Sequence, residues 1–198
     1  MGIENNIEKL LSKGIAQPYE VKSKANLLYS IRIDGDGKLT PEYEKIRAPK
    51  RGEYAFQTDV VISIKGDGSK IHNIPLVVIE IKNNTRKSGI TSHEILTYST
   101  KALKHKEIYP YLRYGLLYIH PRENLPQRFF MHNVGFDFAI VVRDPKKEID
   151  AIIKLVNDQL AVSENLRKTI GNTKKATIWR YSVKAEMEFR EQDEKNSG

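Results

Sequence analysis

Two acidic side chains and one lysine stand within the two most apolar stretches of this chain. Asp59 directly precedes the run Val60–Ile64, and Glu80 and Lys82 close the run Ile74–Lys82. Side chains alternate along a strand, so Glu80 and Lys82 share one face and the residue between them points the other way. A glutamate that follows four apolar residues is costly to bury unless a cation or hydrogen bonds compensate its charge.

The turn-forming residues Gly66–Ser69 lie between these two runs and predict a hairpin that brings Asp59 and Glu80 side by side. Two adjacent carboxylates repel each other unless a divalent ion lies between them. A hard cation held by carboxylates neutralises a phosphodiester and lowers the pKa of a bound water, and a lysine on the same face orients or deprotonates that water. We therefore expect Mg²⁺-dependent phosphodiester hydrolysis, with Mn²⁺ as a substitute ion. The simpler alternative is a buried salt bridge.

The charge of the chain favours a polyanionic partner. Its 198 residues include 33 Lys and Arg against 25 Asp and Glu, a net charge of +8, and DNA is the expected partner. Basic residues close to the expected site in sequence are candidate phosphate contacts, although any one cluster of them is better explained as a solvated face than as a contact. They are Lys45, Arg47, Lys50, Arg51, Arg86, Lys87, Lys101 and Lys104.

The periodicity of apolar residues predicts an α/β fold with a central mixed β-sheet flanked by helices. A strand, a helix and another strand in succession indicate a parallel crossover beside the antiparallel hairpin. We expect one domain over 1–190 and a disordered tail over 191–198, with 176–189 either strand or helix. The expected helices are Glu4–Lys13, Ser92–Lys106 and one opening at Asp144–Pro145; the expected strands are Leu27–Ile33, Tyr54–Lys65, Ile74–Lys82, Tyr114–Ile119 and Phe136–Val142.

Within the helix Ser92–Lys106, Ser92 is the expected N-cap. Ile95, Tyr98, Ala102 and Leu103 fall on one helical face, which is the expected buried stripe.

The segment Gln57–Asp59 together with Ile74–Asn83 resembles the PD-(D/E)XK nuclease superfamily, which includes many restriction endonucleases. The second stretch is particularly similar to the nuclease domain of the motor subunit of type I restriction enzymes. The resemblance covers about residues 54–120 and implies a restriction endonuclease-like core. It implies that Asp59 and Glu80 are metal ligands, that the carbonyl of Ile81 is a third ligand and that Lys82 is the catalytic lysine. Thr58 replaces the proline of the family motif.

The resemblance also points to residues on two helices. Some members carry Gln-x-x-x-Tyr after the catalytic strand, and Glu94 and Tyr98 have that spacing here with Glu in place of Gln. The alternative is that Tyr98 belongs to the core and Glu94 to the surface. Members often add a glutamate from the first helix, for which Glu8 is the best candidate. Glu4, Glu42 and Glu44 are the other candidates.

These observations lead to the expectation of a stand-alone, restriction-type endonuclease that acts as a homodimer. A structure-specific DNA repair nuclease and a non-catalytic DNA-binding module with the same fold are the alternatives. We expect no nucleotide cofactor, because no Gly-rich phosphate loop followed by Lys and Ser or Thr occurs. The absence of cysteine, of long apolar runs and of a secretory signal leads to the expectation of a cytoplasmic protein without a membrane span.

Overall fold

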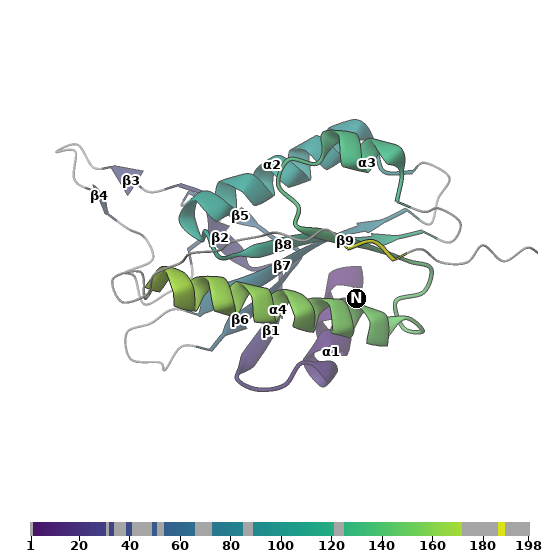
Figure 1. The fold of residues 1–198 in the computed structure, drawn as a ribbon, viewed down its shortest axis with the longest axis horizontal. Helices are drawn as coiled ribbons and strands as arrows, with labels where there is room; N and C mark the ends of the chain where they lie inside the picture. The colour runs from purple at the N-terminus through teal and green to yellow at the C-terminus, as the bar shows by residue number, and fades with distance from the viewer. Residues whose placement is uncertain are drawn as a thin grey trace, which may run out of the picture.

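A five-stranded mixed sheet with the strand order β1-β6-β7-β8-β9 forms the centre of the molecule (Figure 1). The computed structural model describes residues 2–30, 32–33, 39–40, 49–50, 54–65, 73–84, 89–120, 125–171 and 186–188. The pairs β1–β6 and β6–β7 are antiparallel, whereas β7–β8 and β8–β9 are parallel. The expected mixed sheet is therefore confirmed. Its strands are β1 Tyr19–Ser23, β6 Val60–Ile64, β7 Ile74–Asn83, β8 Arg113–Ile119 and β9 Phe138–Val142.

Helices cover both faces of this sheet. Helices α1 (Ile3–Gly14) and α4 (Ile149–Gly171) lie against one face, and α2 (Ser92–Ile108) and α3 (Gln127–His132) lie against the other (Figure 1). Strand β7 is the middle strand, so its apolar run contributes to both core clusters, with Val77 and Ile79 in one and Val78 in the other. This double burial explains why the run is continuously apolar until Glu80.

Two of the expected strands are wrong, because each is divided into two shorter strands. Parts of them form two small antiparallel sheets. The expected strand Leu27–Ile33 divides into β2 (Asn26–Leu28) and β3 (Arg32–Ile33), which pair with β5 (Ala55–Gln57) and β4 (Leu39–Thr40). The expected strand Tyr54–Lys65 divides into β5 and β6. It breaks at Thr58, whose backbone N–H and side-chain hydroxyl both donate to the carbonyl of Ala25 at 2.8 and 2.9 Å.

The third long strand of the antiparallel part is β1, which the sequence analysis does not identify. In α2, the N-cap is Thr91 rather than Ser92, and Leu103 is exposed where burial is expected. The buried residues of α2 are Ile95, Ser99, Ala102 and His105.

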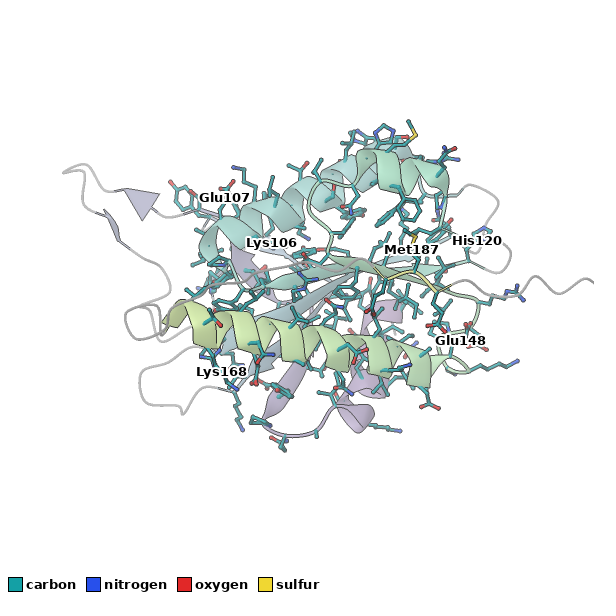
Figure 2. The ribbon with its side chains drawn as sticks, in the orientation of Figure 1. Lys106, Glu107, His120, Glu148, Lys168 and Met187 are labelled. Atoms are coloured by element: carbon teal, nitrogen blue, oxygen red, sulfur yellow. The ribbon has the colours of Figure 1, made fainter. Side chains whose placement is uncertain are left out.

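The C-terminal helix α4 begins at Ile149, four residues after Pro145, and Glu148 lies at this end of the helix (Figure 2). Before the helix, the carbonyl of Asp144 accepts turn hydrogen bonds from the backbone N–H groups of Lys147 and Glu148. The apolar side chains of Ile152, Val156 and Leu160 pack into the core on the α1 side. The expected turn at 66–69, most of 176–189 and all of 191–198 lie outside the described residues. In the part of the chain that is described, no helix is long and apolar enough to cross a membrane.

Candidate active site

Asp59 and Glu80 meet at the end of the β6–β7 pair. Val60 pairs with Ile79, so one residue further along the ladder Asp59 lies opposite Glu80. The Oδ2 atom of Asp59 accepts a hydrogen bond from the backbone N–H of Ile81 at 2.7 Å. The backbone carbonyl of Asp59 accepts the N–H of Lys24 at 2.9 Å. The side-chain carboxylate and the backbone carbonyl of Asp59 are therefore both fixed by hydrogen bonds from neighbouring backbone N–H groups.

Glu80 is a buried carboxylate with two side-chain partners. It is only 2% exposed, and its Oε1 atom lies 2.6 Å from Nζ of Lys101 and accepts the hydroxyl of Tyr114 at 2.5 Å. Burial raises the pKa of Glu80 above its ordinary value and the charge of Asp59 adds to this, while Lys101 and the hydroxyl of Tyr114 oppose it. The negative charge of this buried carboxylate therefore requires a nearby cation.

Lys82 projects from the same face of β7 as Glu80 and forms an ion pair with Oε1 of Glu94. The other oxygen of Glu94, Oε2, accepts the backbone N–H of Thr91 at 2.9 Å and so completes a capping box at the start of α2. Burial acts to raise the pKa of Glu94, but hydrogen bonds from Lys82 and Thr91 lower it overall. One carboxylate thus caps the helix and orients the lysine.

A polar stripe on α2 runs across the site. Glu94, Tyr98, Lys101 and His105 are spaced by four, three and four residues, which places them on one helical face. Burial raises the pKa of Tyr98, and Glu80, Asp59 and Glu94 raise it further, whereas Lys82 lowers it. Tyr98 is therefore within electrostatic reach of all four charged groups. The structure brings Glu94 and Tyr98 to the site, as the resemblance implies.

Glu8 reaches the same end of the sheet from α1. Its Oε2 atom accepts the backbone N–H of Ser23 at 3.0 Å and also the hydroxyl of Ser23. Ser23 is the last residue of β1 and pairs with Val60, which follows Asp59. Glu8 is thus anchored one strand away from the aspartate.

The candidate phosphate contacts divide into three groups. Lys45, Arg47, Arg51, Arg86 and Lys87 lie outside the described residues. Lys50 is exposed, and Lys104 is exposed with Glu107 at 2.8 Å (Figure 2). Lys101 points inward to Glu80 and to the carbonyl of Gln57. Its role as a phosphate contact stays a prediction, and its observed role is to compensate a buried charge.

The donor atoms of this site agree in type with a magnesium ion. Asp59 and Glu80 offer hard carboxylate oxygens, and magnesium in proteins usually takes one or two carboxylates and keeps several waters. The neighbouring carbonyl of Ile81 is of the same hard type. Among the described residues, no group of three or more His, Cys, Asp and Glu side chains is arranged to hold a metal ion.

Two partners of Glu80 are missed by reasoning from the sequence. Tyr114 is expected only as the first residue of the strand Tyr114–Ile119, yet it is fully buried and its hydroxyl donates to the carboxylate. Lys101 is expected as a phosphate contact. Its position seven residues after Glu94 is the signal that would have placed it over the site, since i and i+7 share a helical face.

No protein-family model matches the chain, and no curated protein matches it significantly. A function for this chain is therefore argued from the geometry of the site.

Proposed function

We propose that this protein is a magnesium-dependent endonuclease that hydrolyses DNA phosphodiester bonds, with a restriction endonuclease-like core and a restriction-type role. The observation that carries the proposal is the buried Glu80 opposite Asp59, with Lys82 on the same face of β7. Structural strands have no need of such a set, because burying charge there costs stability.

In this proposal, Asp59 and Glu80 hold the ion, and the carbonyl of Ile81 completes the protein's contribution. The bound ion supplies charge neutralisation at the phosphate and a water of lowered pKa. Lys82 would orient that water or take its proton, and its ion pair with Glu94 fixes the position of the ammonium group. Tyr98 lies near enough to these charged groups for them to shift its pKa, and Glu8 holds the end of β1 that pairs next to Asp59.

A second function, a non-catalytic DNA-binding module, is favoured by one contact. Lys101 already compensates Glu80 from within the chain at 2.6 Å, which is how a purely structural ion pair is arranged. The two functions differ in what Lys82 does. In the nuclease it acts on the reacting atoms, whereas in the binding module it is one cation among many.

The test is cleavage of supercoiled plasmid by wild type, Lys82→Ala and Lys104→Ala, each with magnesium or with excess chelator. We expect cleavage by wild type and Lys104→Ala only with magnesium. Lys82→Ala should lose roughly 10²- to 10⁴-fold in rate, the usual contribution of a proton-transfer group. Full activity in chelator, or an undiminished Lys82→Ala rate, would reject the proposal.

The proposal includes a homodimer, because one such site cuts one strand and two-fold symmetry supplies the second. End mapping of the plasmid products and the sedimentation mass in solution test this part. Single-strand nicks from a protein that sediments as a monomer would favour the repair-type alternative over the restriction type.

A further inference from the structure

A continuous row of rings extends from the partner of Glu80 to the protein surface. The ring centroids of Tyr114 and His105 lie 5.6 Å apart, those of His105 and Phe56 lie 5.9 Å apart, and those of Phe56 and Tyr29 lie 4.0 Å apart with an interplanar angle of 18°. Tyr54 follows at 6.4 Å from Tyr29. The row passes from β8 through α2 to the β2–β5 sheet, which lies beneath the C-terminal end of α2 (Figure 1).

The outer end of the row is exposed to solvent. Tyr54 is 44% exposed and Phe56 is 39% exposed, so each presents a large apolar ring surface to solvent. Tyr54 also has a φ of 55°, a conformation that is uncommon for a bulky residue. The backbone N–H of Tyr29 donates to the carbonyl of Tyr54 at 2.8 Å and holds this residue in place. The structure thus presents an aromatic side chain outward at an energetic cost.

The exposed rings lie close to the candidate active site. Phe56 is three residues before Asp59, which limits the separation of their Cα atoms to about 10 Å. The intervening residue Gln57 accepts a hydrogen bond from Lys101, the same lysine that pairs with Glu80. Lys24 is exposed and its backbone N–H binds the carbonyl of Asp59, so a positive charge accompanies the rings.

Cationic groups beside exposed rings suit one ligand chemistry in particular, which is a nucleic acid strand with unpaired bases. Every base has a π-face that stacks on an aromatic side chain, while the phosphates follow the cations. In a duplex these faces are covered by neighbouring base pairs, so stacking requires a single strand, an end or an extruded base.

We propose that Tyr54 and Phe56 form a stacking platform for unpaired bases adjacent to the phosphate that enters the active site. This inference rests on the proposed nuclease function and, within it, favours the structure-specific alternative, because it narrows the substrate to DNA that is single-stranded or locally unpaired at the cut. Both rings are exposed, and the ring of Tyr29, 4.0 Å from Phe56 and 6.4 Å from Tyr54, links them.

The test measures binding in chelator, so that no cleavage occurs, by fluorescence anisotropy of the full chain. The probes are a labelled oligothymidylate, an abasic oligonucleotide of equal length and a duplex. Wild type should bind the oligothymidylate about 5- to 150-fold more tightly than the abasic strand, the range that stacking of one base supplies.

Variants at Tyr54 separate stacking from folding. Asn tolerates a positive φ better than other non-glycine residues, so Tyr54→Asn should fold normally while it loses the preference for bases and keeps its affinity for the abasic strand. Tyr54→Phe should retain the preference. Phe130→Ala, which removes an exposed ring from α3 outside the row, is the matched control and should change neither affinity.

Equal wild-type affinity for the two strands, or an equal loss for both in Tyr54→Asn, would overturn the platform. Magnesium is then added to the same samples to separate the two proposals. Cleavage without any preference for bases leaves the nuclease standing and removes the platform. Preference for bases without cleavage leaves the platform standing as a binding site and removes the nuclease. Failure to bind the two single strands and the duplex removes both, whereas binding of the duplex alone leaves the nuclease standing and removes the platform.

Discussion

Replacement of Lys101 by methionine tests what the buried carboxylate is for. Lys101 is the cation beside Glu80. Its loss leaves that carboxylate, 2% exposed, with the hydroxyl of Tyr114 as its one remaining side-chain partner among the described residues. Breaking a buried pair by removing one partner costs about 3–5 kcal/mol. A chain of this length loses roughly 2–4 °C in melting temperature for each kcal/mol, so the variant should melt about 6–20 °C below wild type in chelator.

Magnesium should restore much of this loss if Asp59 and Glu80 are metal ligands. An ion present at 100 times its Kd adds about 2.7 kcal/mol to the free energy of unfolding. In wild type the ion competes with the ammonium group of Lys101 for Glu80, so the gain should be smaller than in Lys101→Met. The assay is thermal unfolding of both proteins, with chelator and across a magnesium titration.

Two further variants complete the design. Lys104→Met removes an exposed lysine of the same helix, whose pair with Glu107 should contribute at most about 1 kcal/mol. The double variant Glu80→Gln, Lys101→Met removes both charges and should recover most of the wild-type stability. A large loss in Lys101→Met that magnesium does not reduce would show a structural ion pair and refute the metal site. A loss below about 1 kcal/mol would show that Lys101 does not compensate Glu80.

Three other outcomes are expected. Asp59→Asn should abolish cleavage, leave the melting temperature in chelator at or above that of wild type, and reduce the stabilisation by magnesium; a variant that unfolds early and cuts in proportion to its folded fraction would contradict this. Lys82→Ala should retain DNA affinity, and the pKa of Glu94 in carboxyl-carbon NMR titration should rise when its partner is lost. Burial, reinforced by the charge of Lys101, lowers the pKa of His105 from 6.5 to about 3, so the folded state resists protonation and stability is lost as the pH falls below 6.5. At pH 5 this loss is about 2 kcal/mol, and denaturant titrations of His105→Leu should show a correspondingly smaller fall between pH 7 and pH 5.

The parts of the site on the two central strands are predictable from the sequence because their signal is local. Strand alternation places Glu80 and Lys82 on one face, and the continuous apolar run predicts a strand buried on both faces. The turn residues between the runs predict antiparallel neighbours, and the observed β6–β7 pairing confirms this prediction. Asp59 opposite Glu80 follows from that register alone.

The contributions of α2 are harder to predict because the helix lies over charged groups rather than over a purely apolar surface. An amphipathic analysis seeks an apolar stripe and therefore selects Leu103, which is exposed. The face toward the site instead carries Tyr98, Lys101 and His105 between smaller buried residues. Strand β1 is missed for a related reason, since Tyr19–Ser23 has only one fully buried position in five residues.

The net charge of the described groups around Tyr98 bears on the proposal that a metal ion and a phosphodiester bind this site together. Three carboxylates, those of Asp59, Glu80 and Glu94, surround two ammonium groups, those of Lys82 and Lys101, so one negative charge is uncompensated. On the proposed function, a divalent ion bound alone would make the net charge of these groups positive. A phosphodiester bound alone would be repelled by their negative net charge. Binding of both restores neutrality. Because buried charge is tolerated only when it is compensated, on the proposed function each ligand should stabilise the binding of the other.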